Sequence, residues 1–170
     1  LNNNNFSTIP GNIWNLDSLY DLDLSVNSIS LIPNNIENLL DLSKLNLSAN
    51  NLTSLPDSIV NLTNLTELKL QANELTEIPE NIDDLTNLTT LELSYNNIIT
   101  FPDGLLNINN LTQLYLHGNC LTSLPDSICV KLSGCNITVA GNKLPETYQN
   151  NNNFQCINSW GSQNNEDCEN

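Results

Sequence analysis

A period of 23 residues runs through most of this 170-residue sequence and restricts the folds open to it. Each repeat follows the pattern LxxLxLxxNxLxxIPxxIxxLxx, and position 1 falls at Leu19, Leu42, Leu65, Leu88 and Leu111. Asparagine occupies position 9 in seven successive repeats, at Asn4, Asn27, Asn50, Asn73, Asn96, Asn119 and Asn142. Such regular spacing indicates that similar structural units stack on one another and bury a shared core.

Each repeated residue type has a physical reason. Leucines at positions 4 and 6 alternate with other residues, which predicts a short strand whose leucines point inward. The strands of successive repeats are expected to pair in parallel and form one continuous curved sheet. Because the asparagine carboxamide both donates and accepts hydrogen bonds, a stacked row of asparagines can satisfy backbone groups at the buried turn after each strand. Proline at position 15 fixes the backbone on the return side, where short helical or extended segments close each coil.

This consensus resembles the leucine-rich-repeat (LRR) family, in its class of 23-residue repeats with Ile-Pro or Leu-Pro at positions 14 and 15. The resemblance covers residues 1–144 and implies an α/β repeat solenoid, with a curved parallel sheet on the concave face and short helical or extended segments on the convex face. It also implies a non-enzymatic module that binds proteins through the concave face. We expect a partial first coil, five full repeats and a final partial repeat, with the last strand and turn in residues 136–144. Residues 145–170 depart from the pattern and are expected to form an irregular, cysteine-containing cap or tail.

Aromatic residues gather on neighbouring predicted strands of the concave face. The candidate ligand-binding residues are Tyr95, Tyr115 and His117, together with Glu92, Lys69 and Gln113. Rigid amphipathic rings lose little entropy on contact and are frequent in binding hot spots. Ordinary cross-strand packing of aromatic side chains is the alternative interpretation.

Acidic residues follow the proline in four repeats, at Asp57, Glu80, Asp103 and Asp126. A stacked row of carboxylates could bind calcium. An acid directly after a helix-starting proline also complements the dipole of a short helical turn. We favour the second interpretation and expect no metal site.

The composition excludes several classes of function. The net charge is -15, with nineteen acidic residues against four lysines and no arginine, so the basic clusters that nucleic acids require are missing. No apolar run is long enough to predict a membrane span. The chain has one histidine and lacks a glycine-rich phosphate loop or a nucleophile motif, so we expect neither catalysis nor a cofactor.

All the cysteines lie in the C-terminal part of the chain, at Cys120, Cys129, Cys135, Cys156 and Cys168. This clustering predicts an end stapled by two disulfides, with one free thiol and a pairing that the sequence leaves open. Disulfides indicate an oxidising compartment, so we expect an extracellular, secreted protein. Reduced thiols in a cytoplasmic protein are the alternative, and many members of the class that the repeat resembles are intracellular.

Eight Asn-x-Ser/Thr sequons make N-glycosylation a candidate modification, at Asn5, Asn46, Asn51, Asn61, Asn64, Asn87, Asn110 and Asn136. Asparagine is so frequent in this chain that chance alone predicts several of them. Asn5 and Asn51 are expected to be the best acceptors, because position 10 projects beyond the sheet edge. A glycan on Asn46 or Asn136 would stand on the concave face and block a partner there.

We therefore expect an extracellular module that binds a protein or glycan partner on its concave face. The first alternative is a structural (glyco)protein subunit that self-assembles with its own copies end to end into a filament. It is motivated by a sequence that begins at position 6 of a repeat, which leaves the first coil uncovered unless residues precede it. The second alternative is an intracellular signalling scaffold.

Overall fold

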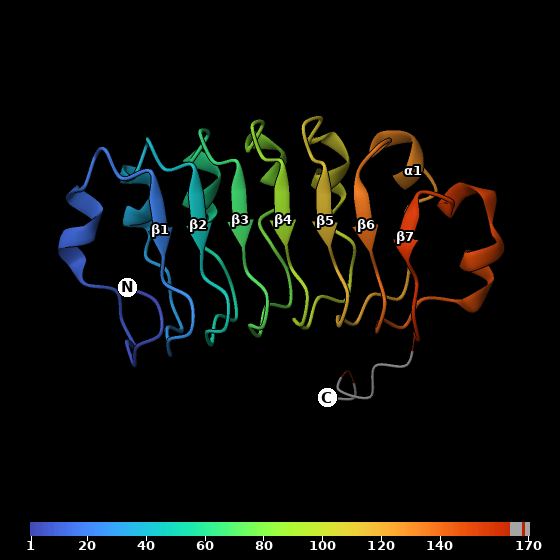
Figure 1. The fold of residues 1–170 in the computed structure, drawn as a ribbon, viewed down its shortest axis with the longest axis horizontal. Helices are drawn as coiled ribbons and strands as arrows, with labels where there is room; N and C mark the ends of the chain where they lie inside the picture. The colour runs from blue at the N-terminus through green and yellow to red at the C-terminus, as the bar shows by residue number, and fades with distance from the viewer. Residues whose placement is uncertain (164–167, 169–170) are drawn as a thin grey trace.

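The computed structural model describes residues 1–163 and 168, and these fold around one seven-stranded parallel sheet. The strands are β1 (Asp21–Asp23), β2 (Lys44–Asn46), β3 (Glu67–Lys69), β4 (Thr90–Glu92), β5 (Gln113–Tyr115), β6 (Asn136–Thr138) and β7 (Ile157–Ser159). They pair in sequence order, and Figure 1 shows them side by side along the length of the molecule with the helical turns behind them. The predicted α/β repeat solenoid is confirmed.

The register of the sheet reproduces the period of the sequence. Between β1 and β6 each residue pairs with the residue 23 positions later, as in Asp21 with Lys44 and Leu22 with Leu45. Because side chains alternate along a strand, this register places one leucine or isoleucine of every strand in a single row inside the coil. That row is at most 4% exposed from β1 to β6.

Short helical turns on the far side of each coil follow the prolines. They are η1 (Gly11–Asn15), η2 (Asn34–Asn38), η3 (Asp57–Asn61), η4 (Ile82–Asp84) and η5 (Asp103–Asn107), while the sixth coil has α1 (Ile128–Lys131). In four of the 3-10 turns the residue directly before the first helical residue is proline. Proline suits this place because its fixed φ prepares the helical turn and its missing N–H needs no partner there.

The core consists of stacked aliphatic side chains. Leucines at the same position of successive coils, such as Leu42, Leu65 and Leu88, are fully buried and belong to one continuous cluster. A coil by itself would expose one side of this interior, so each coil is stabilised by its neighbours. No helix of the described residues is long and apolar enough to cross a membrane.

The C-terminal end of the solenoid differs from the sequence expectation. The prediction that residues 136–144 hold the last strand is wrong, because β7 adds a further strand beside β6. The segment expected to be irregular also contains η6 (Glu146–Asn150) and η7 (Asn152–Phe154). The boundary at residue 144 between repeats and cap stays a prediction.

A shorter last coil explains why the repeat pattern did not reveal β7. Ile137 pairs with Ile157, only 20 positions later, and the register then shifts. At the irregularity the side-chain oxygen of Asn158 accepts a hydrogen bond from the N–H of Ile137 at 2.9 Å. The buried ring of Phe154 stacks on Tyr148 with 4.3 Å between centroids, so aromatic packing covers the end of the aliphatic core.

Candidate protein-binding face

The asparagines at position 9 lie at the turn that follows each strand, where they bond neighbouring coils. The side-chain oxygen of Asn96 accepts from the N–H of Leu75 in the preceding coil at 3.0 Å. Its amide nitrogen donates to the carbonyls of Leu70 and Leu93, both at 3.0 Å. The same accepting bond and two donating bonds recur at Asn27, Asn50, Asn73 and Asn142.

Asn119 makes the equivalent bonds, accepting from Ile98 and donating to Leu93 and Leu116. Asn4 is exposed and donates to the nearby carbonyls of Leu1 and Asn2. The row therefore satisfies backbone groups from the second coil onward, where the turn after the strand is enclosed by coils on both sides.

The residue before each of these asparagines has a left-handed backbone. At position 8, φ is 55° for Val26 and Tyr95, and it is 67° for Gly118. L-residues avoid this region because Cβ crowds the backbone, at a cost of about 1–2 kcal/mol. The sequence analysis missed this feature, although the glycines at position 8 of the last coils are a signal for it.

Tyr95 lies over the glycine of the next coil and reaches the concave face from this left-handed turn. A Cβ atom at Gly118 would lie 2.6 Å from Cδ1 of Tyr95, so only glycine leaves room for the ring in this position. The tyrosine is nevertheless 62% exposed. The glycine at 118 therefore lets a large ring pack closely against the next coil while most of its surface stays open to solvent.

His117 joins the two tyrosines into one aromatic cluster. Its ring meets Tyr95 edge to face, with 5.0 Å between centroids, and meets Tyr115 in the same manner at 6.5 Å. Nδ1 of His117 lies 3.1 Å from Oγ1 of Thr138 on the next strand, which fixes the ring orientation. The structure thus brings together the three aromatic residues predicted from the sequence, from two adjacent coils.

Burial lowers the pKa of His117 below its usual value of 6.5, and the negative charge of Glu92 opposes that shift in part. The imidazole is therefore mainly uncharged at neutral pH. An uncharged ring between two tyrosines gives this part of the face an apolar surface that also carries hydrogen-bonding groups.

The other three candidate residues adjoin this cluster. Gln113 accepts a hydrogen bond from the hydroxyl of Tyr115 at 3.2 Å. Glu92 is the strand partner of Tyr115, and Lys69 is the strand partner of Glu92. The six candidate residues therefore form one continuous surface across β3, β4 and β5.

Charged residues dominate the N-terminal half of the same face. Lys69 Nζ lies 2.6 Å from a Glu67 carboxylate oxygen and 3.8 Å from one of Glu92, and Lys44 lies 4.0 Å from Glu67. The hydrogen bond with Glu67 raises the pKa of Lys69, partial burial opposes this, and Glu92 adds to it. Partly exposed pairs of this kind contribute about 0–1 kcal/mol each, so their main effect is to neutralise charge beside the aromatic cluster.

The cysteines form two disulfides, Cys120 with Cys168 and Cys129 with Cys156. The predicted count of two bridges is confirmed, and the structure supplies the pairing. Cys135 is free and buried, and burial raises its thiol pKa to about 11. This thiol is therefore a packed core residue rather than a reactive one.

Five of the eight sequon asparagines donate a hydrogen bond from the side-chain nitrogen to which a glycan would be attached. Nδ2 of Asn64, Asn87 and Asn110 donates to carbonyls of Leu40, Thr63 and Thr86 in the preceding coils. Asn61 donates to a carboxylate oxygen of Glu37, Asn51 contacts Glu74 at 3.4 Å, and the side-chain oxygen of Asn46 accepts from the N–H of Ser48. Asn5 and Asn136 are exposed. Glycosylation at all eight positions stays a prediction.

The acidic residues after the prolines are exposed, and η3 and η5 begin at Asp57 and Asp103. Within residues 1–163 and 168, no group of three or more His, Cys, Asp or Glu side chains is placed to hold a metal ion.

Comparison with known proteins places these features among repeat proteins. Models of the leucine-rich repeat match residues 18–39, 40–98 and 64–121. An LRR protein of Leptospira interrogans is 30% identical with a TM-score of 0.73, and the match covers 95% of this chain and 47% of that one. The plant peptide hormone receptor RGFR1, solved in complex with RGF2, is 26% identical with a TM-score of 0.66, over 91% of this chain and 30% of the receptor. The chain thus spans less than half the length of either protein.

A comparison with curated protein sequences gave no match. The family models and the similar structures indicate no enzyme family.

Proposed function

The chain belongs to the leucine-rich-repeat family, and from this we propose that it is an extracellular, non-enzymatic module that binds a protein partner on the concave face of its sheet. The family supports protein interaction in general. The place of binding, the compartment and the kind of partner are the proposal.

The observation that carries the proposal is the cluster of Tyr95, His117 and Tyr115. The three rings are fixed against one another edge to face, and Tyr95 is 62% exposed. Rings held in place before contact lose little entropy when a partner covers them, while their hydroxyl and imidazole groups can still form hydrogen bonds. Tyrosine is favoured in binding surfaces for the same reason.

A protein partner fits this surface better than a nucleic acid or an anionic membrane. The chain carries a net charge of -15, so phosphate-rich surfaces are repelled. The similar plant receptor is a peptide hormone receptor in complex with RGF2, which supports a polypeptide ligand by analogy. A glycan partner has no comparable support.

An extracellular location is supported by the two disulfides, because such bonds persist in oxidising compartments. Intact-mass analysis of native material after alkylation under denaturing, non-reducing conditions tests this part of the proposal. One alkylated thiol, at Cys135, is expected. Alkylation of all five cysteines would support the intracellular scaffold instead.

The test of the binding site uses a double variant, Tyr95→Ala with Tyr115→Ala, and a matched control, Tyr20→Ala. Tyr20 is 59% exposed, close to the value for Tyr95, and lies in the second coil, away from the cluster. Immobilised wild-type and variant proteins are incubated with secreted proteins of the source cells, and retained proteins are quantified by mass spectrometry. Candidate partners are then purified and their Kd values measured.

We expect a partner retained by the wild type and by Tyr20→Ala but lost from the double variant. Its Kd should rise about thirtyfold in the double variant, as for hot-spot residues, and less than about twofold in the control. An equal Kd in the double variant and the wild type would refute the concave-face proposal.

End-to-end self-assembly is the second candidate function. An apolar hollow of about 550 Å³ at the N-terminal end, lined by Leu1, Ile13 and Leu16 among others, is the surface such assembly would use. Leu1 and Leu16 are 52% and 50% exposed. Light scattering of native material tests this candidate: fibres would support it, whereas discrete monomers would contradict it.

A further inference from the structure

A groove runs along the flank of the solenoid, on the return segments of the third, fourth and fifth coils. Three overlapping hollows of about 180, 410 and 290 Å³ share Glu80 and follow one another there. Leu55, Ile78 and Phe101 form the floor of this flank groove, and they are 9%, 7% and 5% exposed although most core leucines are at 0–1%. These three side chains are largely buried, and a small edge of each is accessible at the bottom of the groove.

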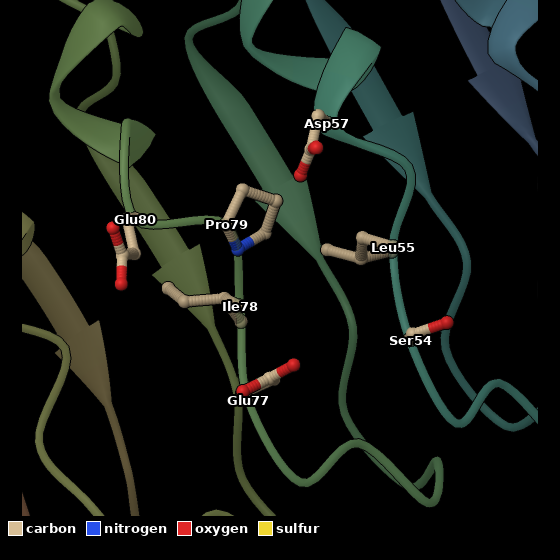
Figure 2. Close-up of a pocket in the computed structure, with 7 residues that line it drawn as sticks. All are labelled: Ser54, Leu55, Asp57, Glu77, Ile78, Pro79 and Glu80. Atoms are coloured by element: carbon tan, nitrogen blue, oxygen red, sulfur yellow. The ribbon is translucent and has the colours of Figure 1, made fainter.

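Carboxylates line the rim of the flank groove. Asp57, Glu77, Glu80 and Asp103 are exposed and border the hollows. Figure 2 shows Leu55 reaching across the gap toward Pro79, while the carboxylates of Asp57 and Glu77 approach the same space from opposite sides. The groove therefore combines an apolar floor with an acidic rim.

These rim charges are not neutralised by the protein's own lysines. In the part of the chain that the structure describes, every ion pair involves Glu67 or Glu92 on the sheet strands. Lys44 and Lys69 belong to those pairs, and the other two lysines lie in and after the sixth coil. The flank groove consequently carries an uncompensated negative potential that attracts cationic groups.

A glycine beside the groove allows the fourth and fifth coils to pack closely. A Cβ atom at Gly104 would lie 2.7 Å from the carbonyl oxygen of Glu80 and 3.0 Å from Cγ2 of Ile82. Any side chain there would force the fourth and fifth coils apart. The absence of a side chain at residue 104 thus preserves the stacking of the two coils that border the groove.

We propose that the flank groove binds an extended segment of a protein partner in which lysine or arginine alternates with small aliphatic residues. Alternate side chains of an extended segment point to opposite sides, so one set can enter the apolar floor while the other stays near the rim. The long stems of lysine and arginine can pack along apolar surface and place their charges at the carboxylates. A polyamine or another purely cationic ligand would leave the floor unused.

The flank groove is independent of the concave site, because it is built from the return segments rather than the strands. A partner protein could occupy either surface, and binding at one does not require the other. The experiment therefore includes a concave-face variant as a separate arm.

The test measures Kd by fluorescence anisotropy with a short labelled peptide of alternating lysine and valine. A second peptide of the same length and charge replaces valine with serine. The groove variant combines Asp57→Asn, Glu80→Gln and Asp103→Asn. The control variant combines Asp17→Asn, Asp41→Asn and Glu146→Gln, which changes the net charge equally at exposed positions outside the groove. Circular dichroism checks that both variants stay folded.

We expect the wild type to bind the lysine–valine peptide, and the groove variant to bind it about tenfold more weakly. The control variant and Tyr95→Ala with Tyr115→Ala should stay within about twofold of the wild type. The lysine–serine peptide should bind the wild type about tenfold more weakly, because it cannot use the apolar floor.

Four outcomes would overturn the inference. Absence of binding between the wild type and the lysine–valine peptide would show that the flank groove is not a binding site for such segments. Equal weakening in the groove and control variants would show general attraction to an acidic protein. Equal affinity for the serine and valine peptides would show that charge alone is recognised. Loss of binding in the concave-face variant with no change in the groove variant would assign the peptide to the other surface.

Discussion

Replacing Asn96 with alanine tests how much the buried asparagine row stabilises the solenoid. Asn96 is 4% exposed and makes one accepting and two donating bonds at 3.0 Å to backbone groups of three segments. The carbonyls of Leu70 and Leu93 each keep a second partner, from Asn73 and Asn119 respectively. The N–H of Leu75, in contrast, donates to the side-chain oxygen of Asn96, so removing that oxygen leaves this donor buried and unsatisfied.

The expected loss follows from this inventory of bonds. An unsatisfied buried donor costs about 1–3 kcal/mol, and the void left by the carboxamide adds about 1 kcal/mol. The total of about 3 kcal/mol corresponds to a fall of about 6–12 °C in Tm for a protein of this size. Urea denaturation followed by circular dichroism measures the change in the free energy of unfolding.

Asn4→Ala is the matched control, because Asn4 is exposed and bonds to the nearby carbonyls of Leu1 and Asn2. We expect its free energy of unfolding to change by less than about 0.5 kcal/mol. A loss in Asn96→Ala no larger than in Asn4→Ala would refute the reasoning, since the buried row would then contribute no net stability.

Asn96→Asp separates the two halves of the carboxamide. The aspartate keeps an oxygen for the N–H of Leu75 but turns a second oxygen toward the carbonyls of Leu70 and Leu93. At neutral pH we expect it to be at least as destabilising as alanine. Part of the loss should be recovered at low pH, where the protonated carboxyl can donate to one carbonyl.

Gly118→Ala should lower the free energy of unfolding by about 1–2 kcal/mol through its φ of 67°, and by more through contact with Tyr95. Gly134→Ala isolates the backbone effect, because φ at Gly134 is 85° and no atom lies within 4 Å of the added Cβ. An equal loss in the free energy of unfolding in the two variants would contradict the contact of residue 118 with Tyr95. Cys135 should resist iodoacetamide at mildly alkaline pH in the native protein, because its thiol pKa is about 11, and it should react once the protein is unfolded. Mass spectrometry after labelling measures the modification. Labelling of Cys135 in the native protein would contradict its burial. For His117, whose folded pKa is lowered below 6.5, the unfolded chain binds the proton first as pH falls, so stability should decrease below about pH 6.5. Urea denaturation at about pH 7.5 and pH 5 should show a smaller decrease in His117→Asn than in the wild type, and identical decreases would contradict the assignment.

The repeated unit and its stacking could be predicted from the sequence because each coil solves the same physical problem. Leucines two residues apart on a strand point to the same side and must be buried. The turn beside this core requires a polar side chain such as Asn96 to bond its backbone groups, and the return segment requires a restricted backbone such as that at Pro102. These requirements are local within a coil, so they recur at a fixed spacing. The concave aromatic cluster could be predicted for the same reason, because Tyr95, Tyr115 and His117 occupy strand and turn positions that the period assigns.

Other features depend on contacts between segments that carry no periodic signal. The pairing of Cys129 with Cys156 follows from the shape of the last coil, and any pairing of the five cysteines is compatible with their order in the chain. Strand β7 escaped prediction because its coil is shorter and its register shifts at Ile137. The position of the Tyr95 ring over Gly118 depends on a left-handed backbone at position 8, which the consensus does not display.

The sequence by itself thus determined a stack of coils with an aliphatic interior, because a period fixes which side chain meets its counterpart in the next coil. The tertiary structure decided how β7 pairs with β6, which cysteines meet and how the acidic residues at 57, 77, 80 and 103 surround the apolar floor of the flank groove. Those features arise from distances between coils and from the direction of individual side chains. Such distances and directions vary from coil to coil, so a repeat pattern cannot encode them.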